Sequence, residues 1–325
     1  MGGRVQIYLV ENLFRCDHML TLVNKQDDNL FVVSHECESA WKFIHNIMPE
    51  AKIMLLPRVP MSGLGKEDSF ISQLAFVRYG KLLTHRMKLE GDVCYLFNAC
   101  DSLHFFMLLV GMEMEKRYVE ICKDFDIPQV TDLTPKYEEH VRHLSQIIGL
   151  EIGVFKAPSW LSLGLVERPE ALDVTPLSWP ELAEKFPIFD EKPPENAVLF
   201  VDAPLQSFRS VAIRLNLEAS RKRVVDYCEK LLDSGKEIHI KPHPNEDQTT
   251  FQGTRIEDRI THLPGAFPAE LVMADYKEIY GFNSSSLGEA KTKSLGGLIT
   301  FLDDESEERF YNTLKSVNAE YEVVK

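Results

Sequence analysis

The chain has 325 residues, of which 44% are hydrophobic and 26% are charged. This balance is typical of a globular protein, and no apolar run approaches the roughly 20 residues that a membrane span needs. A net charge of −14 argues against nucleic acid as a partner, because nucleic-acid binders present a basic face.

The N-terminal half alternates between strand-like and helical patterns. Apolar segments predict strands at 4–12, 29–35, 51–57, 92–99 and 117–122. Apolar residues recur at helical spacing in 39–48 and 69–87. Strands that alternate with helices predict a parallel sheet with helices on both faces.

Residues 156–196 break this alternation, because they are rich in proline and acidic residues and predict an irregular surface connector. A strand at 197–205 then starts a second alternation. It is followed by a helix at 218–236, which has Val224 and Cys228 on its apolar face and ends at Gly235. Further strands are expected at 237–244 and within 257–265, 275–283 and 296–304.

The sequence therefore predicts an α/β protein with two Rossmann-like domains, at 1–155 and 197–325, joined by a linker at 156–196. Ligands of such sheets bind beyond the carboxyl ends of the strands, so we expect the active site in a cleft between the two facing sheets.

Several signals are missing from the sequence. The six cysteines form no CxxC pair and no metal-ligand spacing, which predicts buried free thiols in a reducing compartment and no metal site. No signal peptide is visible, so we expect a cytoplasmic protein. A small basic cluster at 219–225 suggests peripheral contact with the inner membrane face, although such a cluster on an amphipathic helix is more often solvated.

The segment Lys241-Pro242-His243-Pro244 ends the strand that starts at 237. The two prolines restrict the backbone and fix one imidazole beside a lysine. A histidine held in this way can donate a hydrogen bond to a phosphate or carry a proton. The same four residues are equally typical of a rigid turn with an exposed imidazole.

Three serines, Ser284, Ser285 and Ser286, follow the strand expected at 275–283 and precede a helical pattern. Glu289 completes the spacing of a capping box, but one cap takes only one hydroxyl. Three hydroxyls at a helix N-terminus suit a phosphate. Glu270 lies between the histidine and the serines, and its carboxylate can accept hydrogen bonds from both hydroxyls of a ribose.

The motifs KPHP, FPAE and GFNSSSLGE, in this order, resemble the C-terminal half of bacterial GT-B sialyltransferases. That group includes the lipooligosaccharide sialyltransferases and the capsular polysialyltransferases, with their HP and S/SS motifs. The specific resemblance covers residues 197–295 and implies a GT-B fold with a CMP-sugar donor.

The resemblance also implies roles for particular residues. His243, beside Lys241, would contact the CMP phosphate and assist its departure, and Ser285 with Ser284 or Ser286 would hold the same phosphate. Glu270 would bind the ribose. The backbone near Pro242 and Gly265 would frame the cytosine.

The related enzymes carry an acidic-acidic-glycine motif in the N-terminal domain, which supplies the general base. This chain has no clean copy of that motif. Asp124 is the first candidate for the base and Asp101 the second, because each follows a predicted strand.

Taken together, the resemblance implies an inverting glycosyltransferase that uses neither metal nor cofactor. It would move sialic acid, or a related nonulosonic or Kdo sugar, from CMP to a glycan or glycolipid acceptor. Two alternatives stay open. One is a GT-B transferase or epimerase that uses a UDP-sugar. The other is a catalytically silent nucleotide-binding subunit of a glycan-assembly complex, which the missing acidic motif favours.

Overall fold

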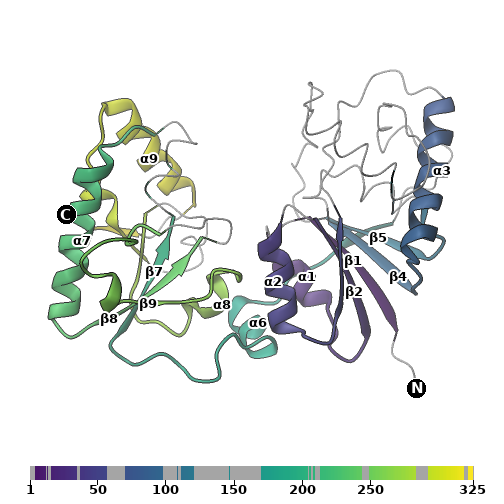
Figure 1. Cartoon of the computed structure of the whole chain (residues 1–325), viewed down its shortest axis with the longest axis horizontal. Helices are drawn as coiled ribbons and strands as arrows, with labels where there is room; N and C mark the ends of the chain where they lie inside the picture. The colour runs from purple at the N-terminus through teal and green to yellow at the C-terminus, as the bar shows by residue number, and fades with distance from the viewer. Residues whose placement is uncertain are drawn as a thin grey trace. The chain divides into compact units, whose positions relative to one another are not determined.

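The computed structural model of the chain describes residues 4–11, 13, 16–34, 37–56, 70–97, 108, 111–120, 146, 170–203, 205, 208, 213–243, 249–282, 292–317 and 321–324. The chain divides into two compact units, Met1–Leu177 and Ser178–Lys325. Each unit is built around its own six-stranded sheet (Figure 1).

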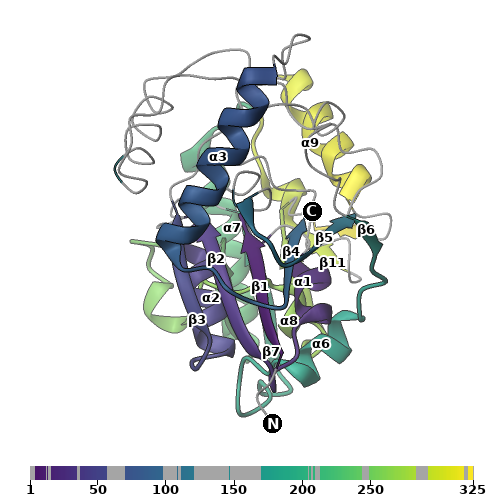
Figure 2. The ribbon, with the colours of Figure 1, turned by 90° about the vertical axis from the view of Figure 1, so that its right-hand side faces the viewer.

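The N-terminal unit has the strand order β3-β2-β1-β4-β5-β6, and all pairs are parallel. The strands are β1 (Val5–Val10), β2 (Asp28–Ser34), β3 (Lys52–Leu56), β4 (Val93–Phe97), β5 (Glu115–Glu120) and β6 (Glu170–Asp173). The connecting helices include α1 (Cys16–Leu22), α2 (Glu38–Ile47) and α3 (Phe70–Met87). Figures 1 and 2 show α1 and α2 on one face of the sheet and α3 on the other. This is the strand order of the Rossmann fold.

The central strand β1 is buried because helices cover both faces of the sheet. Its Tyr8 lies between Phe31 of β2 and Tyr95 of β4, with ring centroids 5.0 and 5.3 Å away. The Tyr8 hydroxyl donates to Oε1 of Gln6 at 2.5 Å, which satisfies the polar end of the ring inside the core.

The C-terminal unit repeats this topology. Its sheet has the order β12-β11-β10-β7-β8-β9, again entirely parallel. The strands are β7 (Ala197–Asp202), β8 (Glu237–Pro242), β9 (Thr261–His262), β10 (Ile279–Gly281), β11 (Thr292–Ser294) and β12 (Tyr321–Val323). The helices include α6 (Trp179–Lys185), α7 (Leu217–Asp233), α8 (Glu270–Met273) and α9 (Asp304–Val317). The first strand of the unit is central, with the second and third on one side and the last three on the other.

Helix α7 confirms the helix predicted at 218–236. Asn216 caps its start by accepting a hydrogen bond from the Ala219 backbone N–H at 3.1 Å. Val224 and Cys228 are fully buried against the sheet, as their spacing predicts. The helix ends before Gly235, whose φ of +88° is a conformation that glycine adopts without strain.

Two expectations differ from the structure. The irregular connector expected at 156–196 contains β6, which adds a strand to the N-terminal sheet, and α6, which buries Leu182. The proline of α6 lies in its first turn, where a missing N–H costs little. The strand expected within 296–304 is wrong. A 3₁₀ turn at Leu295–Leu298 occupies its start, and Phe301 makes only an isolated bridge to Leu215.

The predicted α/β class with two Rossmann-like units is confirmed, and this is the architecture of the GT-B type. The cysteines that are described, Cys16, Cys37, Cys94 and Cys228, form no disulfide and are buried, as predicted. The elements that the sequence pattern did not predict include helices α1, α6, α8 and α9 and strands β6, β11 and β12.

Candidate functional site

The strands of the C-terminal sheet end at a common level. Val201 of β7 is the register partner of Lys241 on β8 and of Gly281 on β10. The strand order reverses between β7 and β10, and ligands of open parallel sheets bind at such a switch point, beyond the carboxyl ends. Lys241, Pro242 and His243 stand at this edge of the sheet.

Lys241 is the most unusual side chain at this edge, because it is only 1% exposed. Its ammonium donates to the carbonyl of Pro242 at 2.6 Å and to that of Gly265 at 2.9 Å. It also lies 4.8 Å from the centroid of the Phe267 ring, in a cation–π contact. Burial lowers the pKa of Lys241 to about 7, and the negative charge of nearby Glu270 opposes part of this shift.

His243 lies directly after β8, and its side chain is exposed. His239 of β8, by contrast, is buried. Its Nδ1 lies 2.8 Å from the Tyr276 hydroxyl. Burial lowers the pKa of His239, and Glu237 opposes the change. His239 is therefore a structural residue, whereas His243 is exposed at the carboxyl end of the strand.

Gly265 and Glu270 belong to the segment that follows β9. A Cβ built on Gly265 would lie 3.9 Å from the Cβ of Pro242, so the two backbones run close together. The carbonyl of Gly265 accepts from the Phe267 N–H at 3.0 Å as well as from Lys241. Glu270 begins α8 and is half-buried. The structure thus brings together five of the predicted site residues: Lys241, Pro242, His243, Gly265 and Glu270.

Asp202, the last residue of β7, was not predicted as part of this edge. It is 1% exposed, and its carboxylate accepts two hydrogen bonds of 2.7 Å from Thr250. Arg221 of α7 donates to the Thr250 carbonyl at 2.8 Å. These contacts hold Thr250 beside the carboxyl end of β7. The sequence signal that could have identified Asp202 is its position, because it is an acidic residue at the end of the apolar run of β7.

The other predicted site residues lie outside the described residues. These are the phosphate candidates Ser284, Ser285 and Ser286 and the general-base candidates Asp124 and Asp101. Phe282 is the last described residue before the serines, and it is fully buried against Phe200 at a centroid distance of 5.6 Å. The segment that leads to the serines is therefore anchored in the core.

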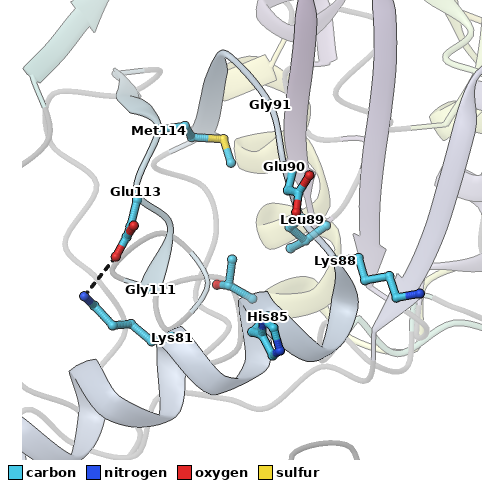
Figure 3. Close-up of a pocket in the computed structure, with 10 residues that line it drawn as sticks. Lys81, His85, Lys88, Leu89, Glu90, Gly91, Gly111, Glu113 and Met114 are labelled. Carbon is cyan, nitrogen blue, oxygen red and sulfur yellow. Dashed lines mark hydrogen bonds and ion pairs between the residues drawn. The ribbon is translucent and has the colours of Figure 1, made fainter.

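A pocket of about 790 Å³ lies in the N-terminal unit, and its described lining contains none of the predicted site residues. It is lined by the end of α3, by residues 88–91 before β4 and by residues 111–114 before β5. Lys81 and Glu113 form an ion pair of 3.1 Å across it (Figure 3). These residues stand at the amino ends of the strands, which is the edge where ligands of parallel sheets do not normally bind.

The described residues contain neither a cluster of metal ligands nor a membrane-spanning helix. Among these residues, no group of three His, Cys, Asp or Glu side chains could hold a metal ion. No helix in the described ranges is both long and apolar enough to cross a membrane.

A family model described as alpha-2,8-polysialyltransferase matches residues 180–292. This range contains the cluster of Lys241, His243, Gly265 and Glu270, and it spans about a third of the chain. The resemblance to bacterial sialyltransferases that the motifs predict is confirmed for this part of the sequence. No curated protein sequence matches the chain.

Several solved structures are similar to the chain. One is a proposed UDP-N-acetylglucosamine 2-epimerase from Listeria monocytogenes, which is 10% identical in sequence. The match covers 98% of this chain and 92% of that chain, with a TM-score of 0.45. The UDP-GlcNAc 2-epimerase from Neisseria meningitidis has 9% identity, coverage of 96% and 90%, and a TM-score of 0.40. A sialyltransferase from Photobacterium damsela has 9% identity, coverage of 100% and 82%, and a TM-score of 0.31. Identities this low carry no information about substrate.

Proposed function

We propose that this chain is a glycosyltransferase that moves sialic acid, or a related nonulosonic or Kdo sugar, from a CMP donor to a glycan or glycolipid acceptor. One observation carries the proposal. In the segment that matches the polysialyltransferase family, Gly265 and Glu270 lie near one buried lysine, Lys241, which precedes His243 at the carboxyl edge of a Rossmann sheet. That edge is where such sheets bind nucleotides.

The donor half of the reaction falls to the C-terminal unit. Cleavage of the bond between the anomeric carbon and the phosphate oxygen leaves the electron pair on CMP. Fixed hydrogen-bond donors stabilise that developing charge. The exposed imidazole of His243 would donate to the phosphate, with Ser284, Ser285 and Ser286 as further donors. Glu270 would accept from the ribose hydroxyls, and the backbone of Pro242 and Gly265 would frame the cytosine.

The acceptor half needs one base. The acceptor hydroxyl oxygen attacks the anomeric carbon from the face opposite to CMP, and its proton passes to a carboxylate within hydrogen-bond reach. Asp124 is our first candidate for this carboxylate and Asp101 our second. Direct attack inverts the configuration and requires no covalent intermediate. The residues assigned to these steps require neither a metal nor a cofactor.

A thermal-shift experiment with CMP, CDP, UMP and UDP tests the donor class. At about 100-fold excess over Kd, a nucleotide stabilises the folded state by about 2.7 kcal/mol, which corresponds to a rise in Tm of about 5 °C. We expect this rise with CMP or CDP only. His243→Ala should abolish most of it, whereas the control His262→Ala, an exposed histidine on β9, should retain it.

Other outcomes have definite meanings. A preference for UDP would replace the CMP proposal with a UDP-sugar transferase or epimerase. No shift with any nucleotide would contradict the proposal. A CMP shift without release of CMP from CMP-sialic acid, in the presence or absence of glycan acceptors, would instead favour a silent nucleotide-binding subunit.

A further inference from the structure

Lys241 forms a bridge between two segments that are distant in the sequence. Its ammonium binds the carbonyl of Pro242, the last residue of β8 and the neighbour of His243, and the carbonyl of Gly265, which opens the segment carrying Glu270. Strand pairing places these segments side by side only as far as the backbone bond from Leu263 to Ile240, at 2.8 Å. Beyond that bond, the lysine connects them.

Hydrogen bonds and packing connect the residues of the segment from Gly265 to Glu270 to one another. The Gly265 carbonyl also accepts from the Phe267 N–H, and Phe267 itself is buried under the lysine ammonium. The Leu271 N–H donates to the Pro268 carbonyl at 3.2 Å, so the chain continues directly into α8. A displacement of Gly265 would therefore be transmitted to Glu270.

Packing alone does not explain a lysine at this position. A buried ammonium loses its hydration, and apolar residues of similar volume often replace buried charges without loss of stability. A methionine would fill the same space without this cost. What the lysine adds is a pair of directed hydrogen bonds between two backbone segments.

We propose that Lys241 is a positioning residue, which holds Glu270 at the distance from His243 that a ribose 5′-phosphate requires. This inference rests on the proposed function and deepens it. Lys241 acts through Glu270 and through the Pro242 and Gly265 backbone rather than as a donor to the phosphate.

The experiment compares the Kd of CMP with that of 2′-deoxy-CMP by isothermal titration calorimetry. A hydrogen bond from the 2′-hydroxyl to the Glu270 carboxylate should make wild type bind CMP about 10-fold more tightly than the deoxy analogue. Glu270→Ala sets the reference for a lost ribose contact, because it removes both acceptor oxygens. In Lys241→Met the ratio of the two Kd values should fall below about 3, toward that reference.

Two further variants complete the design. Lys277→Met removes an exposed lysine at the amino side of β10 and should keep the wild-type ratio. Lys241→Gln can still donate to one carbonyl, so an intermediate ratio is expected. Circular dichroism would reveal whether Lys241→Met folds. If it does not fold, the ratio of the two Kd values in Lys241→Gln tests the positioning role instead.

The outcomes separate this inference from the proposed function. If wild type prefers CMP and a folded Lys241→Met keeps the full ratio, the positioning role is overturned and the proposed function stands. If wild type binds CMP without any ribose preference, the role of Glu270 fails and the positioning role fails with it. If wild type binds no CMP, both the inference and the proposed function fall.

Discussion

The carboxylate of Asp202 accepts both the backbone N–H and the hydroxyl of Thr250, each at 2.7 Å. Both residues are 1% exposed, and Asp202 is the register partner of Pro242 on the neighbouring strand. Asp202 therefore holds Thr250 beside the carboxyl ends of β7 and β8.

Removal of the Asp202 carboxylate should destabilise the C-terminal unit. In Asp202→Ala two buried donors lose their acceptor, which costs about 2–3 kcal/mol. Asp202→Asn should cost less, because the amide oxygen still accepts from the Thr250 N–H. Urea denaturation measures both. The matched control Asp233→Ala, which breaks an exposed ion pair with Arg259, should cost less than about 0.5 kcal/mol. Equal losses for Asp202→Ala and Asp233→Ala would contradict the anchoring role.

Glu278 is the centre of a second polar cluster, near the start of β10. Its carboxylate accepts hydrogen bonds from Lys236 at 2.5 Å, from Lys293 at 2.7 Å and from Tyr280 at 2.9 Å. The bonds from Lys236 and Lys293 make the largest contributions to lowering its pKa to about 2. A carboxyl with a lowered folded-state pKa stabilises the protein above its ordinary pKa and loses this effect as the pH falls.

Glu278→Gln should therefore destabilise the protein at pH 7 by about 1–2 kcal/mol, a modest value because the cluster is partly exposed to solvent. The difference from wild type should shrink as the pH falls from about 4.5 towards 2. Urea denaturation of both proteins at pH 7, 4 and 3 measures this trend. A difference that stays constant over this range would show that the charge of Glu278 contributes nothing.

The fold was predictable because its signal is local. Buried parallel strands are continuous apolar runs, and the residues at 7–10 and 197–201 have this pattern without interruption. Short elements were missed for the same reason. β6 has four residues and pairs only through the sheet edge, and α1 spans two helical turns, so neither shows a full period.

The sequence motifs select candidate residues but not their contacts. KPHP and FPAE predict Lys241, His243 and Glu270 as site residues, and the structure places Lys241 and His243 at the carboxyl end of β8 and Glu270 at the start of α8. The burial of Lys241 depends on Gly265, which lies 24 residues away, and a contact over that separation has no periodic signal. Asp202 was missed because a single acidic residue after a strand is common, and its partner Thr250 is 48 residues away.

Lys241 should make stability depend on pH. Its pKa in the folded protein is about 7, against an ordinary value of 10.5, because burial penalises the charged ammonium. Between these values the unfolded chain binds more protons, so the free energy of unfolding gains a contribution that rises with pH, by up to about 1.4 kcal/mol per pH unit. Below pH 7 the folded lysine is charged, and the burial cost is fully present.

The comparison of wild type with Lys241→Met isolates this contribution. Urea denaturation at pH 6.5, 7.5 and 8.5 should show the methionine variant gaining relative stability as the pH is lowered, because it never carries the buried charge. All other titratable groups contribute equally to the free energy of unfolding of both proteins, so their contributions cancel in the difference. Parallel stability curves would show that Lys241 is hydrated in the folded protein and titrates normally.

The identity of the general base is the last prediction, and it separates an active enzyme from a silent subunit. Asp124→Asn removes the carboxylate that we place first for deprotonating the acceptor hydroxyl, and transfer should fall by about 100-fold to 10,000-fold. The Kd of CMP should not change, because the base acts on the acceptor and not on the donor. The transfer rate with CMP-sialic acid, measured beside CMP binding by calorimetry, checks both statements.

Asp101→Asn is the matched control, because it makes the same chemical change at the second candidate and should leave transfer within about 3-fold of wild type. The reverse pattern would move the role to Asp101. If wild type transfers sugar and neither variant slows it, both assignments are wrong and the base is another group. If wild type binds CMP but transfers nothing, the absence of a clean acidic-acidic-glycine motif acquires a functional meaning, because a unit that holds the leaving group without a base cannot activate an acceptor.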